Sequence, residues 1–582
     1  MDNHKKPFWK NFLIWRRTRI LKSAKVSPPW IPKYRRWVYG LSFIALLFLI
    51  IESGLRWNLP AVIHALSLFL DYVVFFAFLF DSLITFYYTF PKSSYFKKNW
   101  LDILVFAPIL LRGVSIQTGT GLIIIRYVIV LIKVFTRTRK FTNVLRGVRL
   151  NTAQTIVISF SSTILLGTIL LTFPSATTDG NGASFLDALF TATSATCVTG
   201  LIVQDTPVYF STFGQVVILG LIQLGGLGIM TYSAFVAILF GRFSLGQRKM
   251  VQEMLEEEQN IYNMIFYIFK MTMIIEFFGA LLLFFRFNFH FTHIGQAIYQ
   301  SVFHSISAFC NAGFSLFSDS LTQFIDDPVI NIVIITLIVL GGFGFLVIFE
   351  LSAYLRKKRK NLAPHTKLVL IVSLGLILGG FLLFFFLEFD GVLLESPMLS
   401  KLWASFFQSV TTRTAGFNTI AIGSLKEVTL TLMIILMFIG ASPGSTGGGI
   451  KTSTFAVLLL SIKSLIKGEE DIVVFKRTIP SSSIRKALAL LVSAIALVSV
   501  VFLILLNTEK MGYVSLLFEA VSAFGTVGLS TGITPDLSHP GKLLIILLMF
   551  LGRIGPLTLG LALTKEIIKG KVEYPSARIM IG

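Results

Sequence analysis

Charged side chains are scarce in this chain of 582 residues. They make up 14% of the sequence, whereas hydrophobic residues make up 54% and phenylalanine alone occurs 56 times. Soluble globular domains carry about 25% charged residues, so this composition excludes an ordinary soluble protein and favours a protein that spans a membrane. Acidic residues are especially few, 29 against 51 lysines and arginines. No basic stripe interleaved with aromatic residues accompanies this excess, which argues against a nucleic-acid partner.

The motifs that carry covalent chemistry are missing as well. The seven histidines do not follow the spacing of metal ligands. The glycine-rich segment 444–452 resembles a phosphate-binding loop, but Ile450 separates its last glycine from Lys451, and no strand is predicted before it. There are two cysteines, Cys197 and Cys310, which we expect to be free thiols because a disulfide would block the loops that contain them. The chain is therefore predicted not to be an enzyme.

Four short segments centred on glycine recur along the chain at nearly constant spacing. Their glycines are Gly200, Gly313, Gly416 and Gly528, separated by 113, 103 and 112 residues. Each segment follows a short helical stretch and lies between two long apolar spans. Four re-entrant loops around one axis can replace the water shell of an ion by backbone carbonyl groups. The predicted ion-binding residues of this filter are Cys197, Val198, Thr199, Gly200, Cys310, Asn311, Ala312, Gly313, Arg413, Thr414, Ala415, Gly416, Gly525, Thr526, Val527 and Gly528.

One unit is predicted four times after residue 150, and such a repeat determines the fold. It consists of an apolar helix, a short pore helix, a glycine loop and a second apolar helix, and its copies span 151–241, 242–356, 357–470 and 471–582. The first helices are predicted at 154–174, 262–286, 366–388 and 484–507, and the second at 213–240, 328–355, 428–462 and 541–568. Aligned glycines recur in the second helices at Gly225, Gly341, Gly440 and Gly552. The predicted fold is an all-α integral membrane protein with four pseudo-repeats around one pore.

The third and fourth repeats depart from this pattern below the filter. The second helix of the third repeat contains five glycines and a proline between residues 440 and 449, which cannot continue an α-helix. We predict a loop there that enters the aqueous cavity under the filter. The fourth repeat has Arg553 where the first two have glycine, and an arginine inside a membrane is costly unless it has a function. We expect Arg553 to bind loop carbonyls and oppose cations, with a purely structural tether as the alternative. The residues predicted to form this site below the filter are Gly440, Ser442, Gly444, Ser445, Thr446, Gly447, Gly448, Gly449, Lys451 and Arg553.

Basic residues are gathered on one side of the predicted membrane. Clusters occur at 5–36, 137–149, 242–249, 356–360, 463–485 and 565–578, whereas the loops that flank the filters have almost no lysine or arginine. The positive-inside rule then places the clusters and both termini in the cytoplasm and the filters outside. The expected location is the bacterial inner (plasma) membrane, which the chain crosses many times.

The first 150 residues do not fit the repeat. A basic segment, 1–36, is followed by a predicted four-helix bundle at 37–150, with apolar spans near 37–56, 64–90, 99–112 and 120–135. The bundle resembles a voltage-sensor domain in its acidic residues, Asp81 and Asp102, and in its cations, Arg126 and Lys133. A dense voltage sensor has a cation at every third position of its fourth helix. This segment departs from that pattern, because positions 129 and 130 are isoleucine and valine. A sensor and a structural or assembly domain both remain open.

The filter segments carry a family resemblance. Residues 192–201 and 412–419 resemble the loops of the Trk/Ktr/HKT superfamily of potassium transporters, most closely its KtrB-type membrane subunit. The resemblance covers roughly residues 150–582. That family has an intramembrane loop at the position of residues 440–449, which implies that the loop and the residues named with it form a gate. In that family, glycine at all four filter positions implies potassium as the transported ion, whereas serine in the first favours sodium. The resemblance also implies a homodimer, in which each protomer has its own pore, and a cytoplasmic ring of nucleotide-binding regulatory subunits. A voltage-gated cation channel and a sodium-selective or sodium-coupled carrier of the same fold remain as alternatives.

Overall fold

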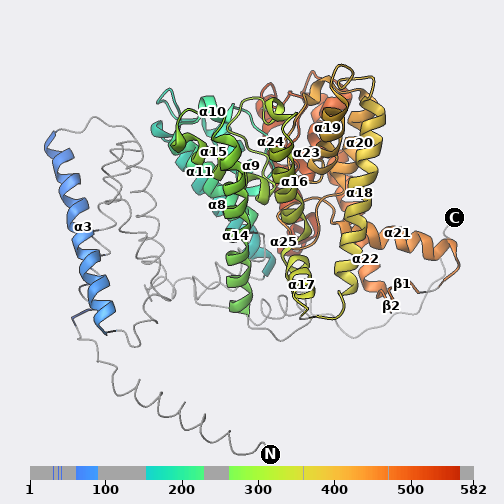
Figure 1. The fold of residues 1–582 in the computed structure, drawn as a ribbon, viewed down its shortest axis with the longest axis horizontal. Helices are drawn as coiled ribbons and strands as arrows, with labels where there is room; N and C mark the ends of the chain where they lie inside the picture. The colour runs from blue at the N-terminus through green and yellow to red at the C-terminus, as the bar shows by residue number, and fades with distance from the viewer. Residues whose placement is uncertain are drawn as a thin grey trace, which may run out of the picture.

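The structure is a computed structural model, and it describes residues 61–88, 152–227, 261–357, 359–469 and 471–563 together with six residues between 30 and 41. Within these ranges the chain is almost entirely helical (Figure 1). The one sheet in this part is a hairpin of β1 (Val473–Val474) and β2 (Arg477–Thr478), in which Val473 pairs with Thr478. The predicted all-α membrane fold is confirmed.

Each repeat contains the predicted elements. The first helices are α8 (Thr152–Leu171), α14 (Ile261–Phe287), α18 (Pro364–Glu388) and α22 (Ser481–Thr508). The pore helices are α9 (Phe185–Cys197), α15 (Ile294–Cys310), α19 (Met398–Thr411) and α23 (Tyr513–Gly525). The second helices are α11 (Thr212–Gly226), α16 (Pro328–Phe343), α20 (Glu427–Phe438) and α24 (His539–Ile554). Beyond them lie α17 (Phe345–Leu355), α21 (Thr452–Ile466) and α25 (Pro556–Leu563), and short turns of helix occur in the outer loops at α10 (Thr206–Tyr209), η3 (Pro174–Ala176), η4 (Thr322–Phe324) and η5 (Ile422–Ser424).

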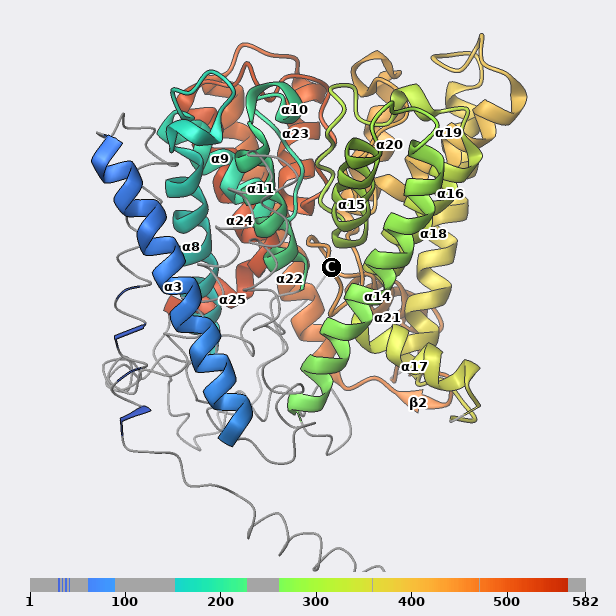
Figure 2. The ribbon, with the colours of Figure 1, turned by 60° about the vertical axis from the view of Figure 1, so that its left-hand side comes forward.

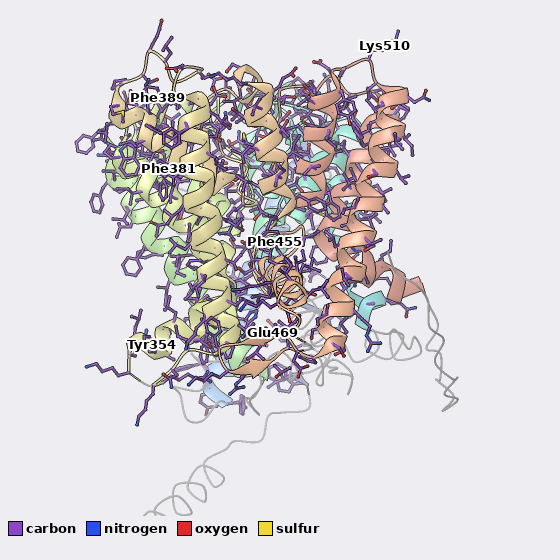
Figure 3. All side chains as sticks on the ribbon, turned by 90° about the vertical axis from the view of Figure 1, so that its right-hand side faces the viewer. Tyr354, Phe381, Phe389, Phe455, Glu469 and Lys510 are labelled. Carbon is purple, nitrogen blue, oxygen red and sulfur yellow. The ribbon has the colours of Figure 1, made fainter. Side chains whose placement is uncertain are left out.

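The first helices form the apolar exterior. All four are long and apolar enough to cross a bilayer, and α16 with α17 makes a fifth candidate span. Most of their outward side chains are apolar, with Phe386 of α18 70% exposed and Val492 and Leu503 of α22 each 64% exposed. Figure 3 shows such side chains, Phe381 and Phe389 among them, along the outer edge of α18. An exposed apolar surface of this kind is the side that lipid covers.

The second helices differ from the continuous helices predicted at 328–355 and 541–568. In the second repeat the helix breaks at Gly344, and α16 and α17 meet at an angle of 104°. In the fourth repeat it breaks at Gly555, and both glycines have a φ of 89°, which a side chain disfavours. The third repeat breaks as predicted, after Phe438, and α21 then runs across the direction of the other helices (Figure 1). A broken second helix is therefore not peculiar to the third repeat.

The repeats close into a ring. The second helix of each repeat packs against the pore helix of the next repeat: α11 contacts α15, α16 contacts α19, α20 contacts α23, and α24 contacts α9. The contact between α24 and α9 joins the fourth repeat to the first, so the four pore helices surround one axis. Figure 2 shows the same bundle from a second side. The salt bridge from Lys542 of α24 to Asp187 of α9, at 3.0 Å, joins the first and last repeats.

The N-terminal prediction is tested only in part. The span expected at 64–90 is the helix α3 (Ala61–Tyr88), and Asp81 lies within it. Tyr34 donates a hydrogen bond of 2.7 Å to the Ala77 carbonyl of this helix. Asp102, Arg126 and Lys133 lie outside the described residues, as do most of the span predicted at 37–56 and all of the spans predicted at 99–112 and 120–135.

Candidate ion pore and gate

The pore helices end where the filter segments begin. Cys197, Cys310 and Gly525 are the last residues of their helices, and the next residues, Val198 and Asn311 among them, have left-handed backbone angles near φ 58°. In the third repeat the helix ends earlier, at Thr411, and the left-handed residue is Thr414. A helix C-terminus carries about half a negative charge. Four such termini directed at one axis favour a cation there.

The four filter glycines form a closed ring. All four have positive φ, between 70° and 94°. Each faces the carbonyl oxygen of the residue that precedes the next glycine around the ring. A methyl group added at Gly200, Gly313, Gly416 or Gly528 would lie 2.5, 2.9, 2.5 or 2.0 Å from the carbonyl oxygens of Ala312, Ala415, Val527 and Thr199, respectively. Side chains are excluded at this level, so the narrowest part of the ring is bounded by backbone.

Hydroxyl groups of the pore helices hold these loops in place, and the sequence prediction missed them. The N–H of Gly200 donates to Ser194 at 3.0 Å, and the N–H of Gly528 donates to Ser522 at 3.1 Å. In the second repeat the aligned Ser307 instead donates to the Phe314 carbonyl at 2.7 Å. The signal was available, because all three serines lie six residues before their filter glycine.

The aligned glycines of the second helices do not line the filter but allow close packing between helices. In the first, second and fourth repeats they let the helix pass close to the end of its own pore helix. A methyl group at Gly225, Gly341 or Gly552 would lie 2.0, 1.9 or 1.9 Å from the carbonyl oxygens of Thr196, Phe309 and Phe524, respectively. Gly440 of the third repeat faces Gly448 of the loop instead, because its helix has already ended.

Substituting Gly225 by alanine is expected to destabilise the pore domain by about 1–3 kcal/mol, the usual cost of overpacking. The thermal unfolding midpoint of the detergent-solubilised protein should fall. The matched control is Gly220→Ala on the same helix, where a methyl group would meet nothing within 4 Å. Equal midpoints for the two variants would show that the close approach is unimportant.

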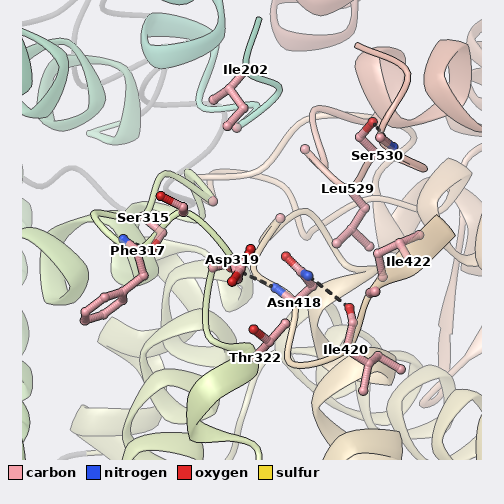
Figure 4. A pocket seen from close by; sticks show the side chains of 18 of the residues that line it. Ile202, Ser315, Phe317, Asp319, Thr322, Asn418, Ile420, Ile422, Leu529 and Ser530 are labelled. Atoms are coloured by element: carbon pink, nitrogen blue, oxygen red, sulfur yellow. Dashed lines mark hydrogen bonds between the residues drawn. The ribbon is translucent and has the colours of Figure 1, made fainter. Parts of the chain in front are cut away.

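The filter opens at one end into a vestibule of about 640 Å³ (Figure 4). All four filter glycines line it, together with Asp205 and Asp319. Among the described residues that line it there is no lysine or arginine. The rim is held across repeats, since the Asn418 N–H donates to Ser320 at 3.2 Å. An anionic vestibule concentrates cations at the entrance of the filter.

The glycine-rich segment between α20 and α21 lies against the filter residues of two repeats. Between α20 and α21 the chain leaves the helix, and Ser442, Thr446, Gly447 and Gly448 are buried. The Gly448 N–H donates to the Thr526 hydroxyl at 2.9 Å, and a methyl group at Gly447 would lie 2.1 Å from the Thr414 hydroxyl. The loop therefore lies directly against the filter residues of the third and fourth repeats.

Other repeats satisfy the backbone of this loop. The N–H groups of Ser442 and Thr446 donate to the Gly342 and Gly341 carbonyls at 3.1 and 3.3 Å, respectively, and the Phe345 N–H donates to Gly444 at 3.1 Å. The break at Gly344 supplies this last donor, because it frees the first amide of α17. Buried backbone groups without partners cost several kcal/mol in a membrane. The contacts with the second repeat explain how an irregular loop persists at this depth.

Arg553 links the loop to two further repeats. Its guanidinium group donates to the carbonyl of Thr446 in the loop and to the carbonyl of Gly225 in the first repeat. It is 4% exposed. The contact with a loop carbonyl that the sequence predicted is present, and the bond to Gly225 was not foreseen. Lys451 donates to the Gly447 carbonyl at 2.6 Å, so a second cation lies within the loop itself.

Two predicted filter side chains point away from the ring. Arg413 donates to the hydroxyl of Ser373 on α18 at 3.1 Å. Cys310 lies against Gly226 and donates to Glu276 at 3.8 Å. Both cysteines are buried free thiols, as predicted. Glu276, a lone acid in an apolar span, was not singled out from the sequence although its isolation was a signal.

Comparison with known proteins places this pore in a family. Residues 122–573 match the TrkH family of cation transport proteins. The chain belongs to this family. The match covers well over half of the chain and begins inside the segment predicted as the N-terminal domain. The resemblance drawn from the filter segments is thus confirmed.

Individual members of the family align over most of their length. The Ktr system potassium uptake protein B of Bacillus subtilis (strain 168) is 42% identical over 444 residues, which is 75% of this chain and 98% of that protein. The potassium/sodium uptake protein NtpJ of Enterococcus hirae is 38% identical over 444 residues, again 75% of this chain and 98% of that protein. Both are ion-uptake proteins, in agreement with the prediction that the chain is a transporter and not an enzyme.

The fold agrees with a solved structure. The potassium transporter TrkH from Vibrio parahaemolyticus superposes with a TM-score of 0.61 at 19% identity, covering 79% of this chain and 95% of that one. This likeness shows a common fold.

Proposed function

We propose that the chain mediates potassium uptake across the plasma membrane through the four-loop filter and that the loop at 440–449, held by Arg553, is its gate. The observation that carries this proposal is the ring of four filter glycines, each facing the carbonyl before the next. Hydrated ions collect in the vestibule near Asp205 and Asp319. They exchange water for backbone carbonyls in the filter. Relatives named as potassium uptake proteins support potassium as the ion.

The position of the loop at 440–449 and the charges beside it support its role as a gate. The loop lies against Thr414 and Thr526, where an ion would leave the filter. Arg553 and Lys451 add two positive charges at the same place. Charges in a low-dielectric surrounding interact strongly, so these cations oppose the passage of another cation. Opening then requires the loop to leave its contacts with the neighbouring repeats.

The wider assembly is part of the proposal. By the positive-inside rule, the basic segments at 356–360 and 463–485 face the cytoplasm. There they would meet a ring of nucleotide-binding regulatory subunits, and the membrane chain would form a homodimer with one pore in each protomer. Light scattering of the purified chain tests the dimer.

Uptake into proteoliposomes tests the function. With separate potassium, sodium and proton gradients, we expect potassium to enter down its own gradient and sodium to enter much more slowly. Equal uptake of sodium would contradict a potassium-selective pore. A requirement for a sodium gradient would instead favour the second candidate, a sodium-coupled carrier, for which the name of the Enterococcus hirae relative is the specific observation.

A further inference from the structure

Two opposite pore helices carry a buried polar side chain at the same register. His304 of α15 lies nine residues before Gly313, and Glu519 of α23 lies nine residues before Gly528. Both side chains are fully buried. The second and fourth repeats face each other across the pore, because the glycine ring runs in the order of the sequence. In the first and third repeats the same position holds Thr191 and a phenylalanine, Phe407.

His304 holds the segment that follows the filter in the second repeat. Its Nδ1 lies 2.8 Å from the Gln300 carbonyl, which can only accept, so Nδ1 carries the proton and Nε2 is an acceptor. Nε2 accepts from the Ser315 hydroxyl at 3.0 Å. Ser315 in turn accepts from the Phe317 N–H at 2.9 Å. Nε2 also accepts from the Leu316 N–H at 3.4 Å, and the imidazole ring stacks on Phe317 with 4.8 Å between the ring centroids, so His304 contacts three successive residues of this turn.

Glu519 holds the segment that follows the filter in the fourth repeat. Its carboxyl group accepts from the Thr534 hydroxyl. Thr534 lies 2.9 Å from Ser530, to which it is joined by a hydrogen bond, and Ser530 accepts from the Gly532 N–H at 2.9 Å. Ser315 and Ser530 each lie two residues after their filter glycine and line the vestibule from different sides (Figure 4).

We call the bonds from His304 to Ser315, and from Glu519 through Thr534 to Ser530, the two clamps of the filter. Each clamp holds a segment that continues directly from the filter glycine of its repeat, so it limits how far the filter carbonyls can move. One way in which a carbonyl ring distinguishes ions is to keep its spacing when a smaller ion enters, so that the smaller ion is poorly coordinated. The glycines can yield, because they lack side chains that would fix them. Resistance to a change in the carbonyl spacing must therefore come from side chains of the pore helices and from the segments that follow the glycines.

We propose that His304 and Glu519 are positioning residues for ion selectivity. Each anchors the wall of the filter in its own repeat, His304 through Ser315 and Glu519 through Thr534 and Ser530. This inference rests on the proposed function of the filter. It assigns the discrimination between potassium and sodium to a pair of opposite clamps. The first and third repeats contribute carbonyl groups to the ring without a clamp of this kind.

The test measures the ratio of potassium to sodium uptake by the purified full chain in proteoliposomes. Ser315→Ala and Ser530→Ala remove the serine of each clamp with little risk to folding, and each should lower the ratio roughly five- to tenfold, the order of one lost buried hydrogen bond. His304→Gln keeps an acceptor and should retain most of the preference, whereas His304→Phe should not. His304→Phe combined with Ser315→Ala should be little worse than His304→Phe alone, because the bond between His304 and Ser315 is already lost in His304→Phe.

The matched control is Phe407→Leu, which disturbs packing at the same register of the third repeat without removing a hydrogen bond. It should leave the ratio unchanged. Folded Ser315→Ala and Ser530→Ala proteins with the wild-type ratio would overturn the inference, as would an equal loss in Phe407→Leu. A wild-type protein without potassium preference would contradict the proposed function instead, so the two failures are distinguishable.

Discussion

Replacing Gly528 by alanine is expected to lower potassium uptake on the order of a hundredfold. The backbone there has φ +89°, and an added methyl group would lie 2.0 Å from the Thr199 carbonyl oxygen and 2.9 Å from the Gly200 Cα. Strain at such a position costs about 1–3 kcal/mol by itself. The contact with Thr199 cannot be relieved by a rotamer change, because the contacted atoms belong to the backbone. The loop of the first repeat must therefore move, and the ring of carbonyls with it.

The control for this prediction lies four residues further on. Gly532 has φ +100°, and a methyl group there would meet nothing within 4 Å. Gly532→Ala therefore imposes a similar backbone strain without touching a neighbouring repeat, and we expect it to retain most of the uptake. Initial rates in proteoliposomes, normalised to the amount of folded protein, compare the two. A similar loss in both variants would mean that local strain, rather than contact between repeats, explains the effect.

The four first helices could be predicted from the sequence with errors of a few residues at their ends, and the presence of a short pore helix in each repeat could be predicted without its bounds. Long apolar runs and a repeated glycine motif leave few alternatives for such elements. The breaks at Gly344 and Gly555 were missed although each had a local signal: Gly341, Gly342 and Gly344 lie within four residues, and Pro556 follows Gly555 directly. Both signals are weaker than the dense cluster of glycine and proline in the third repeat, and long apolar runs on either side favoured a continuous helix.

The contacts between repeats could not be predicted. The sequence indicated that Arg553 would reach the loop, because a buried arginine needs acceptors and the loop has free carbonyls. It did not indicate the bond to Gly225, since that depends on the fourth repeat packing against the first. The roles of His304 and Glu519 are hidden for the same reason: single polar residues in a pore helix have no distinctive pattern, and their partners lie beyond the glycine.

Arg553→Ala should increase ion flux about tenfold or more. The substitution removes two hydrogen bonds that hold the loop, one to Thr446 and one to Gly225, and removes a positive charge from the exit of the filter. Hydrogen bonds from a charged donor contribute about 1.5–3 kcal/mol each, and 1.4 kcal/mol is a factor of ten in an equilibrium. If these bonds stabilise the closed loop, losing them shifts the loop towards open conformations. Potassium flux into proteoliposomes measures the shift.

Two further variants separate the charge from the tether. Arg553→Lys keeps the positive charge but cannot donate to two carbonyls in the planar fork of a guanidinium group. Lys451→Met removes a charge of the same loop and leaves the link between Thr446 and the first repeat in place. If Arg553 acts as a tether, Arg553→Lys should conduct nearly as fast as Arg553→Ala. If it acts as an electrostatic barrier, Lys451→Met should conduct nearly as fast as Arg553→Ala. An Arg553→Ala protein that folds and conducts no faster than wild type would leave Arg553 as a structural link between helices, and the gate would have to be sought elsewhere.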